Sequence, residues 1–208
     1  VDYGGTPEPR GSEVLGGLGW LGTPGEGSYV VSEPDGASNW FPANDHPSDK
    51  ATFGFEITVP EGVEAVANGT RTGETTKGGR TTWSWSVRDP MATYLATVAI
   101  GQYTFFEGTA PDGLPLLSAV ADEVVKQEGK PAIDAVLGQL PQMLTVLSQR
   151  FGPYPFETYG IIVVGKPLGF ALETQTRSIF GSDMWAEPIY QAHEVAHHSA
   201  GLAAREFG

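Results

Sequence analysis

Apolar and polar residues alternate through much of the first half of the chain, and this period of two predicts β-strands. Every second residue over 53–59 is apolar, and Pro60 ends the run. Shorter alternating or wholly apolar runs follow at 28–31, 63–67, 83–87 and 92–99. Asn-Gly at 68–69 and the segment 77–80 supply the tight turns that hairpins need. Residues 28 to about 106 are therefore expected to form an antiparallel sheet domain.

The apolar spacing becomes helical in the second half. Apolar residues recur three or four positions apart over 131–151, and Pro141 within this run predicts a kink or two separate helices. Short apolar runs at 161–164 and 169–172 are expected to be strands, and a further helix is expected from about Ala186. Strands followed by helices indicate an α+β fold.

Two domains are expected from this change of pattern, a β-rich domain over 1–109 and a helix-containing α/β domain over 110–208. The segment APDGLP, residues 110–115, reads as a linker-like turn between them. Residues 1–27 are rich in glycine and proline and are expected to form loops with few regular elements.

The net charge and the lack of cysteine limit which molecules and metal ligands the chain can use. The chain has 208 residues, no cysteine and a formal net charge of −13. An acidic surface repels nucleic acid, which we exclude as a partner, and it repels anionic membranes as well. No run of about 18 apolar residues occurs, so no membrane span is expected. Without a thiolate, any metal ion must be held by histidine and carboxylate.

Three of the four histidines lie within residues 193–198, where HEVAH forms an HEXXH motif. The spacing of His193 and His197 puts both imidazoles on one helix face, where they can be ligands of one zinc ion. Glu194 lies beside them and can accept a proton from a water that the zinc activates. The alternative is a helix with exposed histidines and one helix-stabilising glutamate. His198, about 100° around the helix from His197, is expected to be a solvated polar residue.

Four segments resemble, in order, the aminopeptidases of the M1 family. They are EPDGA to FPANDHPSDKA at 33–51, MATYLA onward at 91–101, GFALETQT at 169–176, and HEVAH at 193–197. The resemblance implies an antiparallel β saddle, of which 1–109 is an incomplete part. It also implies that 110–208 is the beginning of a thermolysin-like α/β catalytic domain.

The resemblance further implies zinc-dependent removal of residues from peptides with a free N-terminus. His193 and His197 would bind the zinc ion, and Glu194 would be the general base. Glu173 would bind the substrate α-ammonium, because a partly desolvated carboxylate forms a strong ion pair. Glu33 would help to hold the same group. The preceding residues would pair with the peptide backbone as an edge strand: Gly169, Phe170, Ala171 and Leu172. The alternatives are a surface glutamate at a strand edge for Glu173 and a turn residue for Glu33.

Two parts of the family pattern have no counterpart in the sequence. The family's third zinc ligand is a glutamate on the next helix, and its transition-state tyrosine lies further on. Glu206 is the one carboxylate after His197, and its spacing does not match. The chain therefore resembles the central part of an M1 enzyme, with the remainder of the catalytic domain as a partner. The 208 residues alone are expected to have little or no peptidase activity.

Three other functions stay open. A non-catalytic M1-like protein would bind peptides or a partner chain through the same pocket. A thermolysin-like endopeptidase is disfavoured, because an ammonium-binding glutamate serves no purpose in cleavage within a chain. An epoxide-hydrolysing relative would share the same zinc residues. The segments 40–49 and 173–176 look most like those of bacterial members, and we expect an extracellular or cell-envelope location, with the cytoplasm as the alternative.

Overall fold

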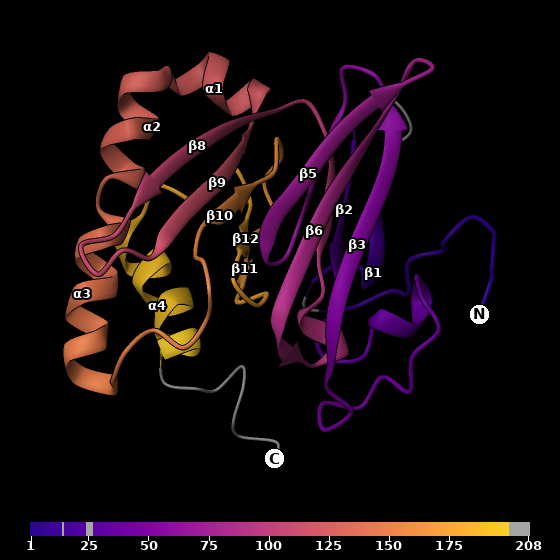
Figure 1. The fold of residues 1–208 in the computed structure, drawn as a ribbon, viewed down its shortest axis with the longest axis horizontal. Coiled ribbons are helices and arrows are strands. Elements are labelled where there is room, and N and C mark those ends of the chain that lie inside the picture. Colours follow the sequence, from indigo (N-terminus) through magenta and orange to yellow (C-terminus); the bar gives the residue numbers. More distant parts are fainter. Residues whose placement is uncertain (14, 24–26, 200–208) are drawn as a thin grey trace.

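The computed structural model describes residues 1–13, 15–23 and 27–199, and these residues form three sheets and four α-helices. Two sheets make up the N-terminal half, and the third sheet lies between them and the helices α1, α2 and α3 (Figure 1). Glu206, the carboxylate considered as a third zinc ligand, lies outside the described residues.

The N-terminal half is antiparallel, as the alternating pattern predicts. One sheet has the order β1-β2-β7-β4 and contains Gly19–Thr23, Gly27–Val31, Val98–Gly101 and Glu64–Ala67. The other has the order β3-β6-β5 and contains Ala51–Pro60, Arg80–Met91 and Thr70–Lys77. Trp83 and Trp85 of β6 are buried between the two sheets, and their indole N–H groups donate to the carbonyls of Val63 and Ala65. The alternation over 53–59 is confirmed, because the apolar residues of β3 face inward.

One local expectation for this half is wrong. Residues 92–99 are not one strand, because Thr93–Leu95 forms a 3-10 turn (η2) before β7 begins. The glycine-rich segment 1–27, expected to have few regular elements, contains the strand β1, whose glycines allow close pairing with β2. A second 3-10 turn, η1, spans Ala37–Asn39.

The third sheet has the order β11-β12-β10-β9-β8 and mixes directions. Its strands are Ala171–Leu172, Ser178–Phe180, Ile161–Val163, Pro115–Ala121 and Tyr103–Thr109. β10 runs parallel to β9 and β12, whereas the two edge strands are antiparallel to their neighbours. This sheet and its helices match the expected α+β class.

β8 belongs to this third sheet and pairs with β9 from Tyr103 to Thr109. The turn at 110–115 is confirmed, but it joins two strands of one hairpin and is not a linker between separate bodies. The change from one sheet to another falls between β7 and β8. The division at residue 109/110 stays a prediction.

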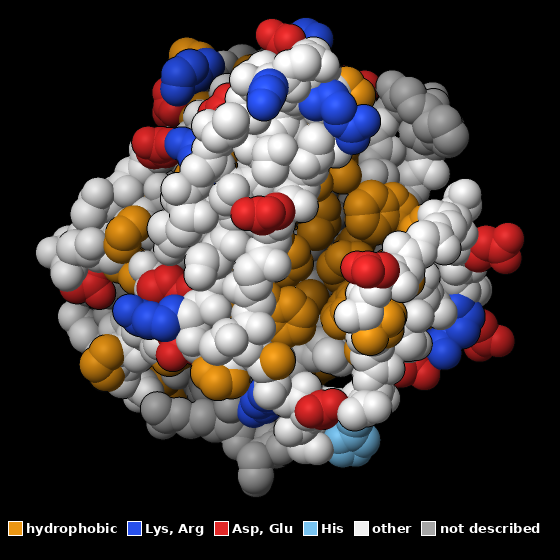
Figure 2. Space-filling view, turned by 45° about the vertical axis from the view of Figure 1, so that its right-hand side comes forward, with side chains coloured by type: hydrophobic (Ala, Val, Ile, Leu, Met, Phe, Trp, Pro, Cys, Tyr) orange, Lys and Arg blue, Asp and Glu red, His pale blue; other side chains and the backbone are white. Residues whose placement is uncertain are grey.

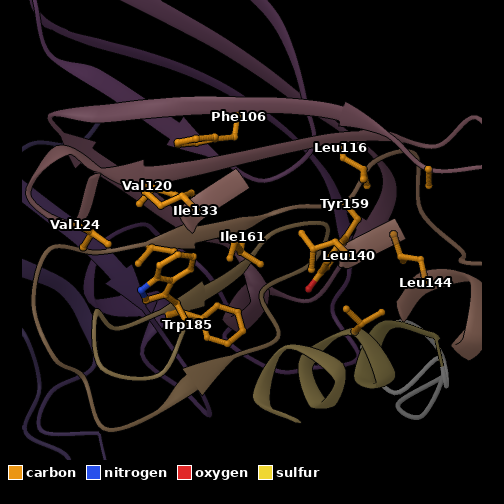
Figure 3. Close-up of a cluster of buried hydrophobic side chains, with 14 of the residues drawn as sticks. Phe106, Leu116, Val120, Val124, Ile133, Leu140, Leu144, Tyr159, Ile161 and Trp185 are labelled. Carbon is orange, nitrogen blue, oxygen red and sulfur yellow. The ribbon is translucent and has the colours of Figure 1, made fainter. Parts of the chain in front are cut away.

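The helices are α1 (Asp122–Glu128), α2 (Lys130–Leu137), α3 (Leu140–Phe151) and α4 (Pro188–Ser199). Pro141 splits the apolar run into two helices, as predicted, and lies in the first turn of α3, where no helical N–H is needed. Ile133, Leu140 and Leu144 pack into one buried cluster with residues of the central strands (Figure 3). α4 lies against α3 and β11, and this contact sets the position of the histidines.

The surface is mixed in character. On the face shown in Figure 2, apolar side chains gather in a hollow and charged side chains lie around it. Among the described residues, no helix is long and apolar enough to cross a membrane.

Candidate metal and substrate site

α4 carries the two predicted zinc ligands on one face. The Nε2 atoms of His193 and His197 are 3.0 Å apart, and their ring centroids are 4.7 Å apart. Two tetrahedral zinc ligands with bonds of about 2.0–2.1 Å have their nitrogens roughly 3.3 Å apart. The pair therefore has close to the separation that one zinc ion requires. His193 is exposed and His197 is half-buried, so the pair faces accessible space.

The fit to zinc is partial. Within the residues that the structure describes, no group of three His, Cys, Asp or Glu side chains is placed to hold a metal ion. Structural and catalytic zinc sites use at least three protein ligands. The described part of the chain thus supplies two imidazoles, and their donor type and spacing suit zinc.

Glu194 follows His193 directly in α4, and its side chain is buried whereas that of His193 is exposed. Burial and, to a smaller extent, the negative charges of Glu173 and Glu33 together raise the pKa of Glu194 to about 8. These three glutamates come from different parts of the chain, so the fold gathers negative charge beside the histidine pair.

Glu33 lies two residues after β2, and Glu173 follows β11 directly. Burial raises the pKa of Glu33, the charge of Glu173 adds to the rise, and His197 opposes it. Burial also raises the pKa of Glu173, against a hydrogen bond from the backbone and the influence of His193. Both side chains are half-buried. The two predicted ammonium-binding carboxylates therefore lie near each other and near the histidines.

The segment before Glu173 is partly a strand. Ala171 and Leu172 form β11, which pairs with β12 and is the end strand of its sheet. Gly169 lies in a bend before the strand, and Phe170 connects the two. Gly169 has a φ of 72°, and the backbone N–H of Gly169 donates to the Asp183 carboxylate at 3.0 Å. Because β11 is at an edge, one side of its backbone faces away from the sheet.

Tyr94 is a member of this group that the sequence did not single out. It lies in η2 and is half-buried. Burial raises the pKa of the Tyr94 phenol to about 12, and the charges of Glu173 and Glu33 contribute to the rise. Its position in the family-like segment 91–101 was the available signal, but the segment alone does not distinguish a site tyrosine from a core one.

The expectation that His198 is solvated is wrong. The side chain is fully buried, with Nδ1 3.0 Å from the Tyr154 hydroxyl and Nε2 2.8 Å from the carbonyl oxygen of Glu173. Burial lowers the pKa of His198 to about 4, so the ring is neutral. The face of α4 that carries His198 is turned into the protein because Tyr154, Phe156 and Tyr159 pack against it.

The segment that follows Glu173 is bound to the N-terminal sheets. The Asn68 amide donates to the carbonyl of Gln175 at 2.7 Å, and the backbone N–H of Gly69 donates to the Thr176 hydroxyl at 2.7 Å. Arg177 is fully buried and donates to the carbonyls of Ala67, Gly69 and Leu117. Burial lowers the pKa of Arg177 to about 10. The Asn-Gly turn predicted at 68–69 thus also fixes the backbone beside the site.

Residues 25–95 match the family model of the Peptidase M1 N-terminal domain. Human glutamyl aminopeptidase is 36% identical over 184 residues, which cover 81% of this chain and 19% of the human protein. Aminopeptidase N of Acetobacter pasteurianus is 28% identical over 181 residues, which cover 79% of this chain and 49% of that protein. The chain therefore spans between 19% and 49% of the length of these two relatives.

The fold is also similar to solved structures. A mutant M1 zinc metallopeptidase from Deinococcus radiodurans, bound to a Tyr-Ser-Ala substrate, matches with a TM-score of 0.83 and 31% identity. The match covers 93% of this chain and 44% of that chain. Sequence, fold and the HEXXH helix agree with one another, and the chain belongs to the M1 peptidase family.

Proposed function

We propose that this chain is part of a zinc-dependent aminopeptidase that releases residues from the free N-terminus of peptides. The observation that carries the proposal is the grouping of Glu33 and Glu173 beside the histidine pair of α4. Glu173 raises the pKa of Glu33, and both raise the pKa of Glu194, so the group is costly without a cation. A substrate ammonium placed between Glu33 and Glu173 would relieve this repulsion.

His193 and His197 would hold one zinc ion through their Nε2 atoms, together with a ligand outside the described residues. When bound, zinc lowers the pKa of a water toward ~7 and polarises a peptide carbonyl. The spacing of 3.0 Å between the two nitrogens supports this role.

Glu194 would be the general base. Its carboxyl is buried in the helix that carries the histidines, and burial with the charges of Glu173 and Glu33 raises its pKa to about 8, so without a metal ion it holds its proton near neutral pH. A nearby cation lowers that pKa and favours the ionised form that a base needs.

The free edge of β11 would bind the peptide backbone. Main-chain hydrogen bonds to Ala171 and Leu172 would extend the substrate along the edge, as added strands do in other peptide complexes. The peptide would then end at Glu173, which comes directly after β11. This order favours recognition of a chain terminus over cleavage within a chain.

The test uses the full-length protein with an aminoacyl anilide and the same anilide with its amino group acetylated. We expect chelator-sensitive hydrolysis of the free-amine substrate and little of the acetylated one. Zinc-loaded protein that hydrolyses neither substrate, but binds peptides with free N-termini, would instead support the non-catalytic binding function. Equal hydrolysis of both substrates would contradict the aminopeptidase assignment.

A further inference from the structure

His198 connects the helix that carries the zinc-binding pair to the residue proposed to bind the substrate ammonium. Its Nε2 atom lies 2.8 Å from the carbonyl oxygen of Glu173, and its Nδ1 atom lies 3.0 Å from the Tyr154 hydroxyl. No part of the side chain is exposed. His198 comes directly after His197 in α4, so this contact joins both parts of the site.

The partners fix which ring nitrogen carries the proton. A carbonyl oxygen only accepts hydrogen bonds, so Nε2 of His198 must be the donor to Glu173. Nδ1 is then the acceptor of the neutral ring, and the Tyr154 hydroxyl donates to it. The tyrosine thereby selects the one tautomer that can bind the Glu173 carbonyl.

The ring has little freedom to turn. Phe156 and Tyr159 meet it edge-on, with centroids 5.7 and 5.5 Å away and interplanar angles of 84° and 81°. Close packing of this kind holds a side chain in one rotamer. The aromatic rings around His198 therefore help Tyr154 to hold the imidazole in the orientation that donates to the Glu173 carbonyl.

Glu173 is held from its other side too. Two residues further on, the carbonyl of Gln175 accepts from Asn68, and Arg177 binds carbonyls of the N-terminal half. These contacts place the segment relative to the N-terminal sheets, whereas His198 places it relative to α4. Of these contacts, the hydrogen bond from His198 is the one that fixes the position of Glu173 relative to α4.

We propose that His198 is a positioning residue that sets the distance between the Glu173 carboxylate and the zinc-binding pair. The inference rests on the proposed function. An aminopeptidase must place the first peptide bond at the metal while the ammonium binds a carboxylate, and one residue of extended chain spans only about 3.3–3.6 Å. A shift of about 1 Å in such a site can reduce the rate about 100-fold.

The experiment compares His198→Phe with His198→Gln in the full-length protein. Phenylalanine has a similar shape but no donor, whereas the glutamine amide can donate to the same carbonyl. The matched control is Tyr159→Phe, which alters the same aromatic cluster and loses a hydrogen bond to Ser178, not to Glu173. For each protein, kcat and KM are measured on an aminoacyl anilide and on its desamino analogue, with zinc content beside them.

We expect His198→Phe to lower the preference for the free-amine substrate, the ratio of the two kcat/KM values, about 10- to 100-fold. Zinc content should be unchanged. His198→Gln should restore the ratio to within about threefold of the parent, and Tyr159→Phe should leave it unchanged. A purely structural role would instead lower activity on both substrates together.

If His198→Phe does not fold, Tyr154→Phe gives the same test, because it leaves the histidine but removes the donor that selects its tautomer. A smaller fall of the ratio in the same direction is then expected. An unchanged ratio in a folded His198→Phe or Tyr154→Phe protein overturns the positioning role, as does an equal loss in His198→Gln. A zinc-loaded parent protein without hydrolysis of the anilide overturns the proposed function itself, and the inference with it.

Discussion

Replacing Asn68 by alanine should destabilise the protein far more than an exposed Asn→Ala change. Asn68 is fully buried, and its amide donates to the carbonyls of Leu95 at 3.0 Å and Gln175 at 2.7 Å. Its side-chain oxygen accepts from the backbone N–H of Thr97 at 2.7 Å. The change removes the partner of the buried Leu95 carbonyl and of the Thr97 N–H. The Gln175 carbonyl loses one of its two donors and keeps the Thr176 hydroxyl.

Each unsatisfied buried group costs about 1–3 kcal/mol. Some relaxation and entry of water reduce the total, so we expect a loss of about 3–5 kcal/mol, at the upper end for single substitutions. The matched control is Asn44→Ala. Asn44 is exposed and donates to the Asp49 carboxylate at 2.7 Å, a bond that water can replace, so about 0.5 kcal/mol or less is expected.

Urea unfolding followed by tryptophan fluorescence measures both free energies, and hydrogen exchange gives a local check. The Thr97 amide should lose protection in Asn68→Ala and keep it in Asn44→Ala, because only the first change removes its acceptor. If the two variants unfold within about 1 kcal/mol of each other, the three bonds do not stabilise the fold as argued.

Three further predictions concern the site. Glu194→Gln should lower kcat about 10²- to 10⁴-fold with zinc content unchanged, and parallel loss of zinc in elemental analysis would assign Glu194 to metal binding instead. His197→Ala should lose most of the zinc, whereas His46→Ala should retain it, since His46 is exposed and hydrogen-bonds Ser48; equal zinc in both would contradict the ligand assignment. The third prediction is a pH dependence. Burial and the charge of Glu173 raise the pKa of Glu33, so the folded state binds the proton of the Glu33 carboxyl more tightly than the unfolded state does. The free energy of unfolding therefore falls as the pH rises above the ordinary pKa of a glutamate. Ligand-free Glu33→Gln should therefore melt at a higher temperature than the parent at about pH 7.5 and at the same temperature near pH 4; identical melting at both pH values would contradict this.

The elements that were predictable from the sequence are those with a strong period or a strong breaker. The two-residue alternation over 53–59 gave the buried face of β3, because successive side chains of a strand point to opposite faces. Pro141 indicated the start of α3, because proline is tolerated in the first turn of a helix and not in its interior. The spacing in HEVAH placed His193 and His197 on one side of α4, since residues four apart are neighbours on a helix.

The buried face of α4 could not be recognised in the same way. It is made mostly of polar side chains, which hydrophobic periodicity does not detect: Gln191, Glu194, Val195, His198 and Ser199. Whether such a face is solvated depends on what packs against it. For His198 the partners are Tyr154 and the carbonyl of Glu173, 44 and 25 residues away in the chain.

The bond between Asn68 and Gln175 joins residues 107 positions apart, and this separation bears on the order of folding. Contacts between distant residues form late, because the loss of chain entropy on closing a long loop precedes the gain. Glu33 follows β2, and Glu173 precedes a segment that the turn between β4 and β5 holds in place. An emerging or partly folded chain, even one with α4 already helical, would therefore lack the grouping of Glu33 with Glu173. Under the proposed function, the chain could recognise a peptide terminus only once its tertiary structure is complete. An incompletely folded polypeptide would then not cleave other peptides around it.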